Sequence, residues 1–96
     1  MTQPDLTLPE FRSLLAAQVA LLDQPSRASF ERHVVEPTQA SSDHGRVWIA
    51  ARAGAAVLGY DETEEEWGTG RVDTLGRIGD WGTWGDQLRW ALSRFP

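Results

Sequence analysis

The 96-residue sequence has no cysteine and no lysine, and each absence excludes a class of chemistry. Without cysteine, disulfide bonds, thiolate metal ligands and cysteine nucleophiles are excluded. Without lysine, Schiff-base catalysis and a P-loop lysine are excluded as well. All nine basic residues are therefore arginines. Of the two histidines, His33 is expected in the last turn of a helix and His44 in a polar loop, and neither has a catalytic partner set around it.

Long apolar runs are also absent. The longest apolar segment, residues 14–22, is too short to span a bilayer. The first residues have neither the basic region nor the apolar region of a signal peptide. The apolar content of 41% is typical of a globular chain, so we expect one small cytoplasmic domain over residues 1–96.

Negative charge is concentrated in one place. Fourteen acidic residues against nine arginines give a net charge of −5, and five of the acids stand within residues 61–66. The remainder of the chain is electrically balanced. Nucleic acids and anionic membranes are disfavoured as partners, because both are polyanions that the acidic stretch would repel.

Two helices are expected in the first half of the sequence. Thr7 and Glu10 form a T-x-x-E capping box, and apolar residues follow it at helical spacing. A second helix is expected over roughly residues 25–36, where Pro37 ends it. The composition of residues 37–45 predicts a polar loop.

Three strands and a last helix are expected in the second half. Residues 46–52 and 55–61 are expected to form a hairpin, and residues 71–78 a third strand after a turn at residues 68–70. The final helix is expected to be capped by Thr83. The predicted fold class is therefore α+β. It is a two-layer domain with a three-stranded antiparallel sheet and helices on one face, in the order α-α-β-β-β-α.

Candidate binding residues gather in and beside the acidic stretch DETEEEW. Alternate acids in an extended chain repel by only about 0.6 kcal/mol per pair in water, so the stretch is also compatible with a solvated strand end. Five tryptophans provide a second signal, because tryptophan dominates the energetics of protein interfaces. Trp48, Trp84 and Trp90 are expected to fill the core, whereas Trp67 and Trp81 lie among glycines and acids. The candidate partner-binding residues are Tyr60, Asp61, Glu62, Glu64, Glu65, Glu66, Trp67 and Trp81.

Catalytic and metal-binding motifs are weak. The acidic residues do not have the spacing of an EF-hand, and no serine or threonine stands in a recognised nucleophile motif. The segment GTGRVDTLG lacks the third glycine of a dinucleotide fingerprint. We therefore expect no catalytic residue, no cofactor and no metal site, and the protein is not expected to be an enzyme. A metal-dependent hydrolase is the remaining catalytic alternative, and stabilisation by divalent ions would indicate it.

The expected function is that of a small acidic module that binds a basic protein. The most concrete version is a bacterial immunity protein, an antitoxin whose carboxylates cover the phosphate-binding cleft of a nuclease toxin. In size, acidity and lack of cysteine the chain resembles small nuclease inhibitors of the barstar type, and no functional residue is transferred from that likeness. The alternative is a structural or accessory subunit of an oligomer or a larger complex. The protein is expected to be a monomer or a homodimer.

Overall fold

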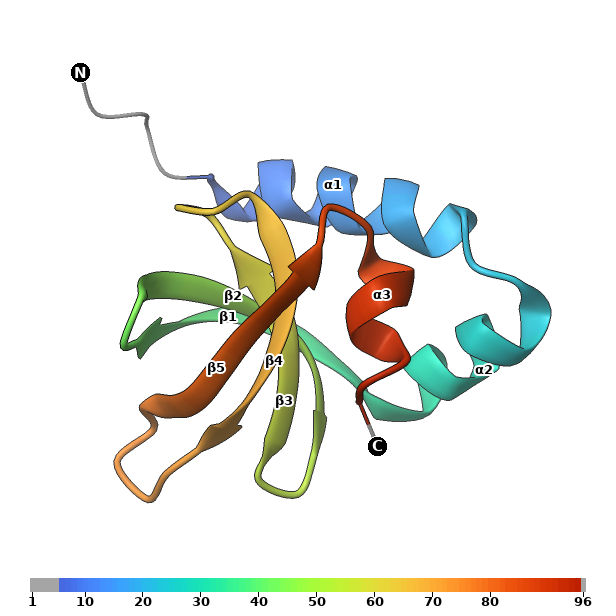
Figure 1. Ribbon diagram of the computed structural model, residues 1–96. Coiled ribbons are helices and arrows are strands. Elements are labelled where there is room, and N and C mark those ends of the chain that lie inside the picture. Colours follow the sequence, from blue (N-terminus) through green and yellow to red (C-terminus); the bar gives the residue numbers. More distant parts are fainter. Residues whose placement is uncertain (1–5, 96) are drawn as a thin grey trace.

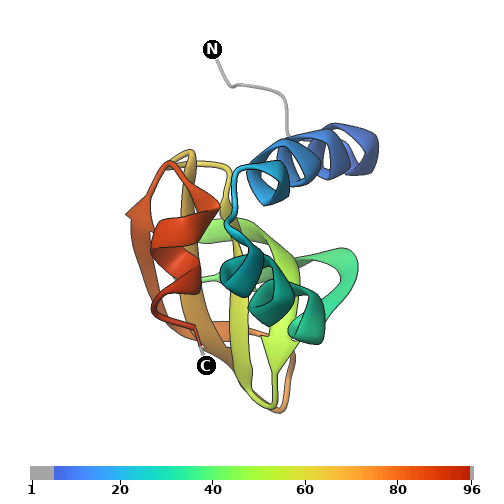
Figure 2. The same ribbon diagram turned by 90° about the vertical axis from the view of Figure 1, so that its right-hand side faces the viewer.

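Residues 6–95 are described by a computed structural model, in which five strands close into a barrel and three helices pack on it (Figure 1). Consecutive strands pair antiparallel, and one parallel pair, Ser42 with Ile78, joins the last strand back to the first. Seen from the helical side, two helices lie in front of the barrel and the first helix lies across its end (Figure 2). The elements are α1 (Leu8–Ala20), α2 (Gln24–His33), β1 (Val34–Ser42), β2 (Gly45–Ala53), β3 (Ala56–Asp61), β4 (Glu66–Val72), β5 (Ile78–Gly85) and α3 (Leu88–Leu92).

The predicted fold class is wrong in its sheet. The α+β class is correct, but the sheet has five strands instead of three, and it closes into a barrel instead of forming one open layer. Residues predicted as a polar loop belong to β1 and its turn. The strand predicted over residues 71–78 is divided between the end of β4 and the start of β5.

α1 follows its local sequence signals. The Glu10 amide donates to Thr7 Oγ1, and the Thr7 amide donates to Glu10 Oε1 at 2.9 Å, so the predicted capping box is confirmed. Phe11 and Leu15, two members of the predicted apolar stripe, are buried against the barrel. A short local signal was sufficient here because both capping partners are three residues apart.

α2 is shorter than predicted. Asp23 caps it by accepting a hydrogen bond of 2.8 Å from the Ser26 amide, and it ends at His33. Val34 already has extended backbone, with φ −60° and ψ 139°, and it begins β1. Pro37 was predicted to end the helix, but it is a buried residue within the strand.

The side chains of β1 do not have the pattern that predicts a strand. Only one of its nine residues is buried, and four of the other eight are exposed polar side chains. Its backbone pairs with β2 from Ser42 opposite Gly45 to Val34 opposite Ala51. β2 is apolar, with residues 47–51 all buried. β1 therefore forms a strand because it pairs with the apolar strand β2. The amino-acid composition of β1 alone does not indicate this pairing.

Two glycines that predicted a turn lie inside β4. A β carbon on Gly68 would lie 2.6 Å from the Trp81 ring, and one on Gly70 would lie 2.7 Å from the Ile78 side chain. These glycines therefore allow large side chains of β5 to pack directly on the backbone of β4. The chain turns before and after β4 instead of within it.

The last helix is also shorter than predicted. Thr83, the predicted cap, and Trp84 both lie in β5, and α3 begins only at Leu88. Gln87 occupies the N-cap without a side-chain hydrogen bond. Gly85 has φ +132°, a conformation that favours glycine, and it ends β5 before the helix starts.

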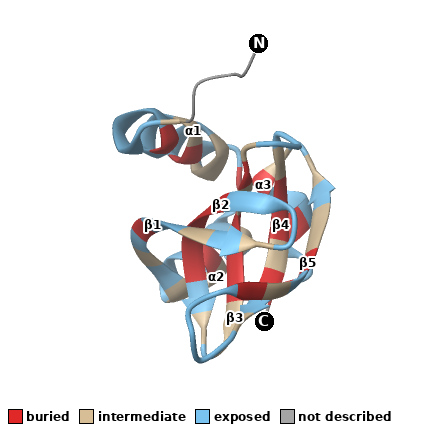
Figure 3. Cartoon of the chain, turned by 90° about the vertical axis from the view of Figure 1, so that its left-hand side faces the viewer, coloured by how far each residue is buried: buried red, intermediate tan, exposed pale blue. Residues whose placement is uncertain are grey.

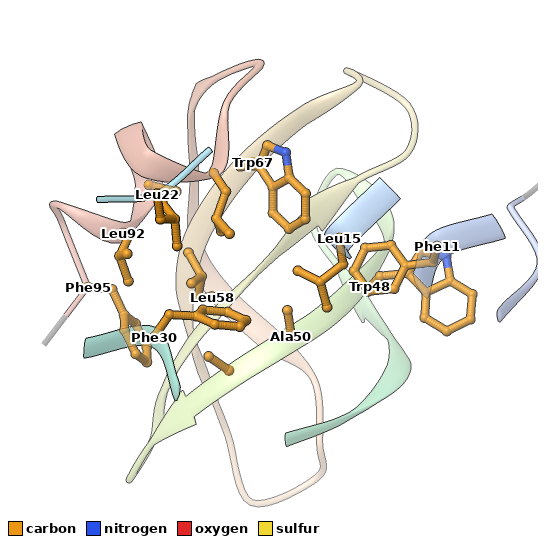
Figure 4. Packing of buried hydrophobic residues seen from close by; sticks show 13 residues of the cluster. Phe11, Leu15, Leu22, Phe30, Trp48, Ala50, Leu58, Trp67, Leu92 and Phe95 are labelled. Atoms are coloured by element: carbon orange, nitrogen blue, oxygen red, sulfur yellow. The ribbon is translucent and has the colours of Figure 1, made fainter. Parts of the chain in front are cut away.

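Two clusters of buried apolar side chains form the core. The larger cluster joins the helices to the strand residues that face them, and Figure 4 shows its labelled members around Leu58. The smaller cluster contains only strand residues, which face away from the helices and fill the barrel: Val47, Ile49, Val57, Ile78 and Trp81. Figure 3 shows buried positions along the strands beneath the helices. None of the helices between residues 6 and 95 has the length and apolar character needed to cross a bilayer.

Candidate protein-binding site

The acidic stretch forms the turn that connects β3 to β4. Asp61, the last residue of β3, pairs with Glu66, the first residue of β4, and residues 62–65 form the turn between them. Glu64 and Glu65 are exposed, whereas Glu62 and Glu66 are partly covered. The turn lies before Trp67 and not at the predicted residues 68–70, because Trp67 pairs with Tyr60. We refer to residues 61–66 as the acidic turn.

A buried carboxylate holds the acidic turn from inside. Asp61 is fully buried, and its Oδ1 accepts hydrogen bonds from the backbone amides of Thr63 at 2.9 Å and Glu64 at 3.1 Å. Its Oδ2 accepts a hydrogen bond of 3.2 Å from the indole nitrogen of Trp81. Hydrogen bonds to a charged group are stronger than those between neutral groups, and three of them compensate the loss of water around the carboxylate. Asp61 therefore fixes the shape of the turn and does not reach its surface.

Glu62 fastens the other side of the turn to the aromatic residues under α1. The indole nitrogen of Trp48 donates a hydrogen bond to Glu62 Oε1. The Trp48 ring in turn stacks on Phe11, with centroids 5.1 Å apart and an interplanar angle of 7° (Figure 4). Glu62 is thus held by a side chain of the core, whereas Glu64 and Glu65 are the exposed carboxylates of the turn.

The candidate aromatic residues lie at different depths. Trp67 is fully buried, and its ring centroid lies 5.1 Å from that of Tyr60 and 5.9 Å from that of Phe11. Trp81 is only 8% exposed and lies in the smaller cluster inside the barrel. Tyr60 alone among the candidate aromatic residues is partly exposed. In this conformation Trp67 and Trp81 support the acidic turn from below, and they do not present a ring to a partner.

The side chain of Tyr60 lies beside the carboxylates of the acidic turn, and its pKa is shifted. Its pKa is raised above the ordinary value, first because the phenol is partly buried and then because Glu65, Glu62 and Asp61 lie nearby. Both causes disfavour the phenolate, one by desolvation and the other by charge repulsion. The Tyr60 hydroxyl therefore keeps its proton at neutral pH beside a group of carboxylates.

The two histidines lie in different surroundings. Within residues 6–95, no three histidine, aspartate or glutamate side chains converge as a metal site requires. The His33 ring packs edge-on against Phe95, with centroids 5.6 Å apart. His44 lies in the turn between β1 and β2, where its amide donates to Ser42 Oγ at 3.1 Å.

A second exposed surface was not predicted. Trp84 and Trp90, both expected in the core, are 40% and 46% exposed. The guanidinium of Arg94 lies 4.3 Å from the Trp84 ring centroid, and that of Arg89 lies 4.4 Å from the Trp90 ring centroid. The sequence signal against a helix here is Gly85, which would weaken the first turn of the predicted helix. We refer to these four residues as the Arg–Trp face.

Comparisons with known proteins give no match. No protein-family model, no curated protein and no solved structure matches this chain.

Proposed function

We propose that the protein is a small non-catalytic module that binds a basic surface of another protein through the acidic turn. The observation that carries this proposal is the buried Asp61 carboxylate, which fixes the backbone of a turn in which Glu64 and Glu65 are exposed to solvent. A solvated strand end needs no such internal support. A fixed turn loses less conformational entropy on binding, so more of the interaction energy appears as affinity.

Charge placement supports the proposal. The net charge of −5 equals the number of acids in residues 61–66, and acids and arginines balance in the rest of the chain, so the excess negative charge is concentrated in this turn. A local field of this kind speeds the association with a positively charged partner and selects against negatively charged ones. The exposed glutamates supply contacts at the rim, and Tyr60 supplies an aromatic edge beside them.

The backbone conformation of the acidic turn also supports the proposed binding function. Glu65 has φ +55°, a left-handed conformation that costs a residue with a side chain about 1–2 kcal/mol. Glycine would adopt this conformation without the cost. Strained positions of this kind cluster at functional sites, and here the strained residue is one of the two exposed glutamates.

The most concrete form of the proposal is an immunity protein that acts in the bacterial cytoplasm. Its partner would be a nuclease toxin, and the glutamates would occupy the cleft that otherwise binds nucleic-acid phosphates. On this proposal the contact residues are Tyr60, Glu62, Glu64, Glu65 and Glu66, whereas Asp61, Trp67 and Trp81 hold them in place. An accessory subunit of a larger complex is the alternative, and it would use the same turn on a permanent partner.

The test is capture of the partner from the cell lysate of the source organism, with the tagged protein as bait. Three baits are compared in low and high salt: the unmodified protein, the E64Q/E65Q/E66Q variant, and a control, E31Q/E36Q/D80N, which removes the same charge elsewhere. Bound proteins are identified by mass spectrometry, and the folding of each bait is checked by circular dichroism.

The proposal expects one stoichiometric basic partner on the unmodified protein and on the control. High salt should weaken its binding, because salt screens exposed charges. The E64Q/E65Q/E66Q variant should fold and capture nothing. Equal capture by that variant, or a partner that is not basic, would exclude the acidic turn as the binding site. Nuclease assays on the captured partner then distinguish an immunity protein from an accessory subunit.

A further inference from the structure

The Arg–Trp face is a rigid surface. The Trp84 ring lies against Gly82, where a β carbon would be 3.5 Å from it, and its indole nitrogen donates to Thr69 Oγ1 at 2.9 Å. The Trp90 ring lies against Gly85, where a β carbon would be 2.9 Å away. Both rings therefore lie close to a glycine of β5 while much of their area stays exposed.

The two arginines of this face are available for anions. Among residues 6–95, no carboxylate lies within ion-pair distance of Arg89 or Arg94. A guanidinium that stacks on an aromatic ring still directs its N–H edge outward, where it can bind a carboxylate through two hydrogen bonds. Two such groups on an acidic protein form a positive and aromatic surface that fits an acidic segment of another chain.

The acidic turn and the Arg–Trp face lie at the same end of the barrel. Trp67, which directly follows Glu66, pairs with Gly85, and Gly85 carries the Trp90 ring. Figures 1 and 2 both place the β3–β4 turn and the β5–α3 connection at this end. Each molecule thus presents a negative and a positive surface side by side.

We propose that two copies of the chain form a twofold-symmetric dimer in which the acidic turn of each copy binds the Arg–Trp face of the other. A twofold axis between the two surfaces forms both contacts at once, and it closes the assembly at two copies. Burial of Trp84 and Trp90 supplies affinity, and the pairing of Glu64 and Glu65 with the arginines sets the orientation.

The charges in the chain favour a second copy over other acidic occupants. Nucleic acids and anionic membranes bring many negative charges toward a protein whose net charge is −5. The acidic turn brings a few charges on a fixed loop, and its neighbouring Arg–Trp face is attracted to the first copy in return. The proposal goes beyond the proposed function, because this dimer covers the acidic turn and a basic partner must displace the second copy.

The test is sedimentation of the purified protein alone, over a wide concentration range in low and high salt. The unmodified protein should dimerise reversibly, and more weakly in high salt. The variants E64R/E65R and R89E/R94E should each be monomeric, since each sets like charges against one another. Mixed in equal amounts, they should form a heterodimer, because each reversed surface then meets a surface of opposite charge. The control R52E/R71E reverses two arginines at the other end of the barrel and should dimerise normally.

Each other result overturns the proposal. A monomer at every concentration excludes the dimer. A dimer that survives both reversals uses another surface, and a mixture that stays monomeric or grows beyond two copies excludes the reciprocal contact. If a reversed variant fails to fold, R89Q/R94Q replaces it, and its dimer dissociation constant should rise by about tenfold or more. R89Q/R94Q should still capture the basic partner, so a failed dimer and a failed proposed function give different results.

Discussion

The indole nitrogen of Trp81 donates a hydrogen bond of 3.2 Å to the buried carboxylate of Asp61, twenty positions earlier in the chain. This contact connects the inside of the barrel to the turn that carries the exposed side chains of Glu64 and Glu65. The same carboxylate accepts the amides of Thr63 and Glu64. The acidic stretch is therefore fixed from below, and this is the structural basis of the proposed binding role.

Removal of the Asp61 carboxylate should destabilise the protein. In Asp61→Ala, the Trp81 indole and two turn amides lose their acceptor, and we expect a loss of about 2–4 kcal/mol in the free energy of unfolding. Asp61→Asn keeps one acceptor oxygen and should lose about 1–2 kcal/mol. Equilibrium denaturation in urea measures both. An alanine variant as stable as the unmodified protein would show that these hydrogen bonds do not fix the turn.

Close packing of β5 on β4 should make Gly68 intolerant of a side chain. A β carbon there would lie 2.4 Å from the Gly82 carbonyl oxygen, so Gly68→Ala should cost about 1–3 kcal/mol or more. Gly79→Ala is the matched control, since nothing lies within 4 Å of its added carbon and its φ is not positive. The control should stay within about 0.5 kcal/mol of the unmodified protein. Equal unfolding midpoints for the two variants would contradict this packing.

Tyr60 should ionise only at strongly alkaline pH. Its pKa is raised by burial and by nearby acids, so the folded state holds the phenolic proton more tightly than the unfolded state does. The stability that this provides is complete below a pH of about 10 and is lost as the pH rises through the folded-state pKa.

The single tyrosine allows a direct measurement, because all phenolate absorbance then comes from Tyr60. Glu65→Gln removes the second-largest cause of the shift and should lower this pKa, whereas Glu31→Gln should leave it unchanged. If both variants titrate like the unmodified protein, the charge of Glu65 does not act on the phenol.

The helical layer should contribute to stability through α3. Leu92 belongs to the larger core cluster, and Leu92→Ala should cost about 2–5 kcal/mol, because it leaves a cavity between helix and barrel. Leu75 is 75% exposed, and Leu75→Ala should change stability by less than about 0.5 kcal/mol. Thermal or chemical unfolding compares the two. A small effect at Leu92 would mean that α3 detaches at little cost.

The parts of the fold that depend on near neighbours could be predicted from the sequence. The capping box of α1 and the hairpin of β2 and β3 are formed by residues a few positions apart, and both are present. β1 could not be predicted, because its polar residues adopt an extended backbone only by pairing with β2. Gly68 and Gly70 predicted a turn, since a sequence does not reveal that Trp81 and Ile78 will pack on them.

In the candidate site, too, local features could be predicted from the sequence and long-range contacts could not. The local concentration of acids was visible in the sequence, but the burial of Asp61 depends on Trp81, which comes from a distant strand. Trp84 and Trp90 were expected in the core because an isolated tryptophan in a small domain is usually buried. Their exposure follows from the extension of β5 through Gly85, which shortened the predicted helix.

The measurement that tests the central claim most directly is capture of a basic partner by the folded E64Q/E65Q/E66Q variant beside the unmodified protein. Glu64 and Glu65 are exposed and Glu66 is partly exposed, so loss of their charges should leave the free energy of unfolding unchanged or slightly higher. We predict that it stays folded and loses the partner that the unmodified protein binds. A variant that unfolds, or one that binds the same partner equally well, would contradict the proposal that the acidic turn is a recognition surface.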